Sequence, residues 1–238
     1  FNPIPQPSIS FTTFRYCVIC CQAVILPAKG CDEPMQVLKD DIKQRIINVA
    51  RQEFLRHGFS KASMRVIAAK TGVGVGNLYH YYPGKDDLFR AVVAPVITAC
   101  YTMLHKHRYI SGAWPLSALI SDYLTAFLSD YTAILSEHRA LLKILIFKAQ
   151  GSSLENFKAE FTNCAALKLK AWFADNSLYC QKADKDAVDF MTHLHTVWMF
   201  HMFEEFLMRD IDGKQMQRIV AEHIRFETAG WKTVLQCI

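Results

Sequence analysis

The chain has 238 residues, of which 51% are hydrophobic and 21% are charged, and its formal net charge is +5 at pH 7. It contains no β-type alternation of useful length, no sequence repeat and no low-complexity tract, which excludes β-rich and repetitive classes and predicts an all-α protein. The positive charge is concentrated, because residues 35–85 contain nine Lys or Arg and three acids, whereas residues 1–34 are neutral and residues 86–238 sum to −1.

Residues 1–34 differ in character from the rest. They hold four of the eight cysteines, Cys17, Cys20, Cys21 and Cys31, but a second C-x2-C pair is missing, so the pattern indicates zinc only weakly. The apolar run 16–28 resembles the core of a signal peptide, although no convincing cleavage site follows and the run is too short to cross a membrane comfortably. Met35 precedes the first amphipathic helix, and we expect residues 1–34 to be an extension without a function.

The first predicted helix has one apolar face and ends at Gly58. Its inward residues recur at helical spacing: Ile42, Ile46, Val49, Ala50 and Phe54. Ser63 is a plausible N-cap for a second, short helix that begins at Met64, buries Ile67 and Ala68 and ends at Thr71.

A tight turn at Gly72-Val73-Gly74 leads to a third helix over 75–82. Glycine adopts positive φ without steric cost, so the chain can reverse here between two helices. Leu78 and Tyr82 lie four residues apart and should pack inward. Pro83 and Gly84 end this helix, and Lys85 opens a fourth one with two acids in its first turn.

These elements resemble the TetR (tetracycline-repressor-like) family of bacterial transcriptional regulators. The family pattern is matched over about fifty residues by Ile67-Ala68, Gly72-Val73, Gly76-Asn77-Leu78-Tyr79, Tyr81-Tyr82 and Lys85-Asp86-Asp87-Leu88. Gly74 departs from it, since the family often has a capping Ser or Thr there. The resemblance implies a three-helix DNA-binding domain followed by a larger helical domain for ligand binding and dimerisation, with boundaries at 35–84 and 85–238.

The resemblance also implies site residues. Phosphates would be held by Ser63, Tyr79, Lys85 and Tyr81, and Gly74, Val75, Asn77 and His80 would lie near base edges. An amide such as that of Asn77 suits adenine because it donates and accepts at once, with a solvated side chain as the alternative. The basic segment independently favours a phosphate backbone as partner, with solvated helix faces as the plain alternative.

Beyond Leu88 the sequence predicts further helices near 85–109, 115–136, 138–150, 154–178, 184–209 and 214–235. Large apolar residues surround most of the helix 184–209, so one face should lie in the core and another against a second copy of the chain. By resemblance, the last two long helices form the homodimer interface.

The family further implies a cavity for a small apolar or aromatic effector. Its candidate lining is aromatic: Tyr123, Tyr131, Phe147, Trp172, Phe173 and Trp198. Plain core packing explains the same residues. His193 and His195 point about 200° apart on a helix and cannot easily share an ion, so we expect no metal site.

The predicted function is that of a ligand-responsive, cytoplasmic regulator, acting as a repressor by resemblance, that binds a near-palindromic double-stranded DNA operator as a homodimer. No membrane contact or cofactor is expected, and no catalytic motif is present. The alternatives are an enzyme whose groups meet only on folding and a helical adaptor in which the helix-turn-helix serves structure alone.

Overall fold

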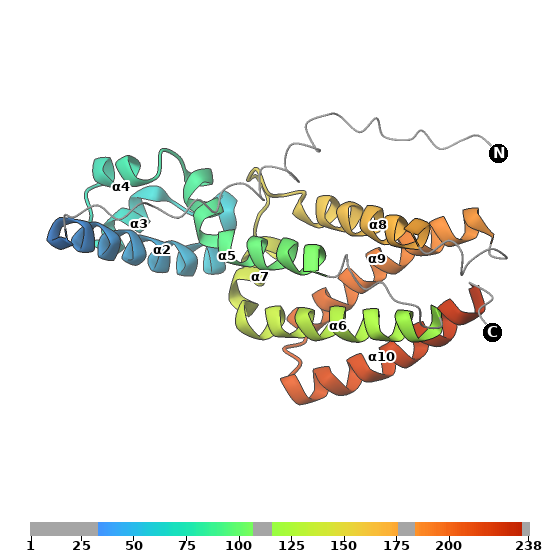
Figure 1. The fold of residues 1–238 in the computed structure, drawn as a ribbon. Helices are drawn as coiled ribbons and strands as arrows, with labels where there is room; N and C mark the ends of the chain where they lie inside the picture. The colour runs from blue at the N-terminus through green and yellow to red at the C-terminus, as the bar shows by residue number, and fades with distance from the viewer. Residues whose placement is uncertain (1–32, 107–115, 176–183, 235–238) are drawn as a thin grey trace. The chain divides into compact units, whose positions relative to one another are not determined.

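The computed structural model describes residues 33–106, 116–175 and 184–234. Within these ranges the chain is all-α, as predicted, and has no strand (Figure 1). The helices are α2 (Glu33–Lys61), α3 (Met64–Thr71), α4 (Val75–Tyr81), α5 (Lys85–Lys106), α6 (Leu116–Glu137), α7 (Arg139–Phe147), α8 (Phe157–Asp175), α9 (Lys185–Met208) and α10 (Gly213–Val234). The four N-terminal cysteines and the apolar run 16–28 lie outside the described residues.

The chain divides into two units, residues 1–41 and residues 42–238. Of the first unit, the structure describes only the start of α2, from Glu33. Gly58, at φ 73° and ψ 170°, interrupts α2 near its end. The predicted stop at Gly58 therefore corresponds to a real break, because only glycine adopts such a conformation readily.

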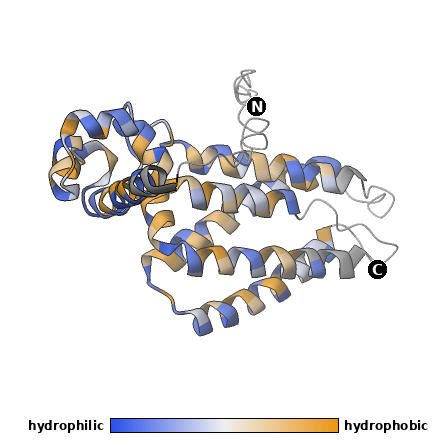
Figure 2. Ribbon diagram, turned by 60° about the vertical axis from the view of Figure 1, so that its left-hand side comes forward, coloured by the Kyte–Doolittle hydropathy of each residue, from blue (hydrophilic) through white to orange (hydrophobic). Residues whose placement is uncertain are grey.

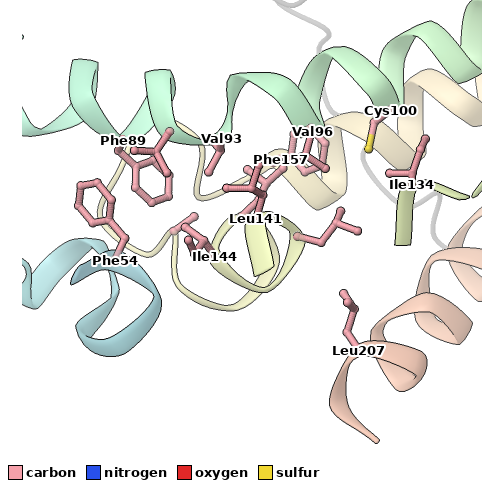
Figure 3. Close-up of a cluster of buried hydrophobic side chains, with 14 of the residues drawn as sticks. Phe54, Phe89, Val93, Val96, Cys100, Ile134, Leu141, Ile144, Phe157 and Leu207 are labelled. Atoms are coloured by element: carbon pink, nitrogen blue, oxygen red, sulfur yellow. The ribbon is translucent and has the colours of Figure 1, made fainter. Parts of the chain in front are cut away.

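One continuous apolar core runs through the second unit, from Ile46 on α2 to Val220 on α10. Phe54 of α2 meets Phe89 of α5 edge to face, with the ring centroids 5.0 Å apart. Figure 3 shows these two rings directed toward each other, with Ile144 of α7 nearby. The core continues past residue 84. The predicted domain boundary between residues 84 and 85 remains a prediction.

The C-terminal helices pack in neighbouring pairs. Helix α10 lies along α6, and α8 lies along α9, while α7 contacts α5, α6, α8 and α9. In Figure 2 hydrophilic and hydrophobic residues alternate along these helices, as expected for helices with one buried face.

Helix α5 is, among the described residues, the one helix long and apolar enough to cross a membrane by length and composition alone. Core helices of globular proteins pass the same test, and 44% of its most apolar window is buried inside the structure. Its buried side, which includes Leu88, Phe89, Val92 and Val96, belongs to the continuous core.

The segment 148–153, between α7 and α8, attaches to the helices that precede it. The Phe59 amide donates to the Lys148 carbonyl at 2.8 Å, and the Ser60 hydroxyl donates to the carbonyl of Gln150. Asp86, in the first turn of α5, accepts from the Ser153 amide at 2.8 Å and from its hydroxyl at 2.6 Å. We call this set of bonds the 148–153 interlock.

Candidate nucleic-acid interface

Helices α2, α3 and α4 pack around a small apolar centre. Phe54 of α2, Ile67 of α3 and Leu78 of α4 are each 0% exposed. Leu78 and Tyr82 are buried, which confirms their predicted inward orientation. The Tyr82 hydroxyl has no hydrogen-bond partner among the residues that the structure describes. Burial raises the pKa of this phenol, so it stays neutral.

The turn between α3 and α4 follows the predicted glycine chemistry. Gly72 ends α3 in the left-handed conformation, at φ 68° and ψ 20°. Its amide donates to the Ala69 carbonyl at 3.2 Å, and the next amide, of Val73, donates to the Ala68 carbonyl at 3.1 Å. These bonds satisfy the last carbonyls of α3 and fix the point where α4 begins.

A buried carboxylate joins α2 to α3. Glu53 is only 5% exposed and accepts from the Lys70 ammonium at 2.6 Å, while the His57 ring lies 3.9 Å away. Removing one partner of a buried ion pair is strongly destabilising. Sequence reasoning missed this pair because the two residues are seventeen positions apart.

Helix α4 presents most of its surface to solvent. Val75 is 39% exposed and Tyr79 is 46% exposed. Asn77 and His80 are exposed as well, and Tyr81 is half-buried. Large side chains that remain uncovered on so short a helix are available for a partner.

Ser63, the predicted N-cap, and Gly74 occupy the N-cap positions of α3 and α4, and neither makes a side-chain capping bond. Ser63 precedes α3 in an extended conformation, and its side chain forms no capping hydrogen bond. Gly74 precedes α4 at φ −60° and ψ 142° and has no side chain to cap with. The first amides of α4 therefore lack the side-chain acceptor that Ser or Thr would supply.

Lys85 has a role that the sequence did not predict. Its ammonium donates to the carbonyls of Ser60 at 3.2 Å and Ala62 at 3.3 Å, and it lies 4.5 Å from the centre of the Phe59 ring. It therefore holds the end of α2 against α5. A phosphate contact from Lys85 remains a prediction, and it would have to share the ammonium with these carbonyls.

The cations of this region lie mainly at the surface. Between residues 42 and 71, seven of them are exposed on α2 and α3: Lys43, Arg45, Arg51, Arg56, Lys61, Arg65 and Lys70. These charges would attract a polyanion to this part of the chain.

The predicted effector-pocket residues fall into three groups. Tyr131 and Trp172 are buried, at 2% and 7% exposure, whereas Phe147 and Trp198 are 39% and 47% exposed. The side chains of Tyr123 and Phe173 lie outside the described residues. Tyr131 stacks on Phe203, and burial raises its pKa well above the ordinary value, with the charges of Cys100 and Glu204 adding to the shift.

A polar cluster lies between α9 and α10. His195 Nδ1 is 3.0 Å from Glu227 Oε2, and the Trp231 indole donates to the same oxygen at 2.7 Å. His223 Nε2 lies 3.9 Å from the other carboxylate oxygen. The helical spacing of Glu227, Trp231 and His223 could have indicated a shared face, but not their partner on α9.

The histidines of α9 point as the predicted geometry requires, since His193 is exposed and His195 is buried. Within the ranges that the structure describes, no group of three His, Cys, Asp or Glu side chains is arranged to hold a metal ion.

Comparison with known proteins gives matches of two kinds. Residues 46–92 match the family model described as "Bacterial regulatory proteins, tetR family". The HTH-type transcriptional regulator UidR of Escherichia coli K12 is 36% identical over 59 residues, which are 25% of this chain and 30% of UidR. The HTH-type transcriptional regulator SAR2658 of Staphylococcus aureus is 32% identical over 95 residues, 39% of this chain and 51% of SAR2658. The matches thus span about a third to a half of these relatives.

Among solved structures, NalD of Pseudomonas aeruginosa, described as the secondary repressor of the MexAB-OprM multidrug efflux pump, has the same fold. Its TM-score is 0.59 at 17% identity, over 78% of this chain and 94% of NalD. The names of these relatives describe them as transcriptional regulators, the class predicted for this chain. The motif of α3 and α4, their geometry and these matches show that residues 46–92 are similar to the corresponding segment of the TetR family of bacterial regulatory proteins.

Proposed function

We propose that the chain is a homodimeric repressor that binds a near-palindromic DNA operator and leaves it when a small apolar or aromatic effector binds among its C-terminal helices. The observation that supports DNA binding most is the exposed surface of α4 in a region of seven exposed cations. A helix that follows such a turn is the element that enters the major groove, while surrounding cations neutralise phosphates. Repression as the sign of regulation rests on family resemblance.

Exposed apolar side chains on α9 and α10 support the homodimer. Seven large apolar side chains of these helices are exposed, among them Phe190 at 64%, Leu194 at 44%, Trp198 at 47% and Phe226 at 64%. Trp198 and Phe226 meet edge to face across the two helices, with ring centroids 5.6 Å apart. A second copy that covers them would present two α4 helices to half-sites about 34 Å apart.

Release by an effector requires that the effector bind two spacings of the α4 helices with different affinity. The buried Tyr131 and Trp172 are the candidates for its site, and the 148–153 interlock offers a connection to α2 and α5. A regulator of this kind acts where the DNA is, so we place it in the cytoplasm.

The test selects duplexes from a random pool with the purified chain at several salt concentrations, beside Tyr79→Ala and Tyr79→Phe. We expect a two-fold-symmetric site whose affinity falls steeply with salt and is reduced in both variants, if the phenol hydroxyl holds a phosphate. Circular dichroism checks that the variants keep their helices. Salt-sensitive binding without an enriched site would indicate a nonspecific DNA binder, and no binding at all would favour the helical adaptor.

A further inference from the structure

Helix α4 carries no Lys, Arg, Asp or Glu, because its sequence is VGNLYHY. Only Leu78 of the seven residues is buried. The groups that it can offer to a groove are the Val75 methyls, the Asn77 amide, the His80 ring and the tyrosine phenols. This set restricts which base edges α4 can recognise.

Guanine presents two acceptors in the major groove and is read best by the paired donors of Arg or by Lys. Neither residue is on α4, and the edge of a His80 ring offers one nitrogen at a time. Adenine presents one acceptor beside one donor, which an amide matches with two bonds, and thymine presents a methyl group. The exposed Asn77 therefore suits an adenine, and the exposed Val75, which points to a different side of the helix, suits a thymine methyl group of another A·T pair.

Gly76 supplies an independent indication that something approaches α4 closely. A Cβ atom built on Gly76 would meet nothing within 4 Å, and the same is true of Gly74. Packing inside the protein therefore does not require glycine at 76, although glycine destabilises a helix relative to alanine. A bare backbone in the first turn is of use where a ligand lies against it.

We propose that α4 reads A·T base pairs, with Asn77 bonded to an adenine, Val75 against a thymine methyl and Gly76 allowing the backbone close to the groove. This rests on the proposed function and adds the class of base pair that is read. Arg65, exposed on α3, is a candidate for reading a guanine in the same half-site. It lies outside α4, so a guanine read by Arg65 agrees with the proposal.

The first experiment repeats the selection from random duplexes with Asn77→Ala and Arg65→Ala beside the unchanged chain. Some positions of the selected site should be enriched with the unchanged chain but not with Asn77→Ala. We expect every such position to be an A·T pair. A symmetric site with G·C at those positions would overturn this inference and leave the proposed function standing. Failure to enrich any site with the unchanged chain would overturn the proposed function, and this inference with it.

The second experiment modifies single bases in the selected site. Replacing the contacted thymine by deoxyuridine removes one methyl group and should weaken binding by the unchanged chain about fourfold. The same replacement should not change the DNA affinity of Val75→Ala. Replacing the contacted adenine by 7-deazaadenine removes one acceptor and should weaken binding at least about fivefold, again with no effect in Asn77→Ala. Equal losses in the chain and its variant would show that the pair does not interact.

The third experiment uses Gly76→Ala. The added methyl has room inside the protein and favours the helix, so the unfolding midpoint should be unchanged or higher. DNA affinity should nevertheless fall about tenfold or more, the size of a lost contact of about 1.4 kcal/mol. Gly230→Ala is the matched control, since a Cβ there also meets nothing within 4 Å. Unchanged DNA affinity in Gly76→Ala would overturn the inference that the backbone at Gly76 lies close to the groove.

Discussion

Helix α4 and the α9–α10 pair both leave large side chains exposed, but their surroundings differ. Around α4 most of the exposed groups are polar or amphipathic, such as Tyr79 and Asn77, and exposed cations lie on the preceding helices. On α9 and α10 large apolar rings, such as those of Phe190 and Phe226, are exposed beside charged residues. The first surface suits a polyanion and the second suits another apolar surface.

The two surfaces also differ in what lies beneath them. Leu78 fixes α4 by apolar packing alone, whereas Trp198 on α9 contacts the ring of His223, with centroids 5.1 Å apart, next to the Glu227 cluster. Buried charges destabilise a fold when they lose a partner. We therefore expect the α9–α10 surface to depend on the charged groups that lie below it.

The largest expected effect comes from Glu227→Ala. The substitution leaves the His195 ring and the Trp231 indole without their acceptor, which should lower the free energy of unfolding by about 3 kcal/mol. Urea unfolding followed by circular dichroism measures it. Glu222→Ala is the control, because this exposed carboxylate pairs only with the exposed Arg225 in the structure and should cost less than about 0.5 kcal/mol. Similar costs for both would show that the buried cluster adds nothing.

Trp198→Asp combined with Phe226→Asp should break the proposed dimer. Each is an aromatic side chain of the kind that dominates interfaces, so a loss of about 2 kcal/mol or more is expected, at least a thirtyfold weaker association. Sedimentation velocity over a range of concentrations gives the oligomeric state. Leu167→Asp changes a residue on α8 that is 61% exposed and should leave association unaltered. A double variant that still dimerises would locate the interface elsewhere.

Gly151→Ala tests the 148–153 interlock. Gly151 has φ 84°, and a Cβ there would lie 3.0 Å from Ser60 Oγ, so the substitution should destabilise the protein by about 1–2 kcal/mol. If the interlock holds the DNA-reading helices in place, operator affinity should fall although no DNA-facing residue has changed. Gly213→Ala has open space and no positive φ, and it serves as the matched control.

Acid should weaken the packing of α9 against α10. Burial lowers the pKa of His223, although the charge of Glu227 opposes the shift. As the pH falls, the unfolded chain therefore binds this proton before the folded chain does. The free energy of unfolding consequently falls as the pH drops below the ordinary value of 6.5. Burial alone would raise the pKa of Glu227, but the His195 bond and the charges of His195 and His223 lower it overall. Its contribution is therefore also lost on acidification, below about 4.5.

Between pH 6.5 and 5.5 one proton can change stability by no more than about 1.4 kcal/mol. The test measures the unfolding midpoints of the unchanged chain and of His223→Gln between about pH 6.5 and 5.5. The difference between the two midpoints should become smaller as the pH falls. A midpoint that stays constant in the unchanged chain would contradict the assignment.

The smallest effect is expected from Gly74→Ser. Serine at the N-cap can accept from the first amides of α4, which should add a few tenths of a kcal/mol, about 0.3, to stability. Thermal unfolding measures it, with Gly74→Ala as the variant that adds a methyl but no acceptor. Equal stability of the two variants would show that the cap is of no consequence in this turn.

Much of this protein could be predicted from the sequence because its information is local. Apolar residues at helical spacing predicted α3 and α4 within a residue, and Gly58 and Gly72 adopt the positive φ that glycine allows. The inward orientation of Leu78 followed from the same periodicity. The ends of α7 and α8 were less predictable: helices were expected over 138–150 and 154–178, but α7 ends at Phe147 and α8 begins at Phe157. The residues between them form the 148–153 interlock, whose partners lie 67 to 90 positions earlier.

Tertiary structure decided which polar groups have partners. The sequence marked Lys85 as a phosphate ligand, but its ammonium is directed to the carbonyls of Ser60 and Ala62. It marked His195 only as a weak metal candidate, whereas the fold pairs it with Glu227, thirty-two residues away. Helical periodicity specifies which side of a helix is buried, because it depends on neighbouring residues along the chain. The partner of a buried charge depends on which helices meet, and only the packing of the whole core determines that.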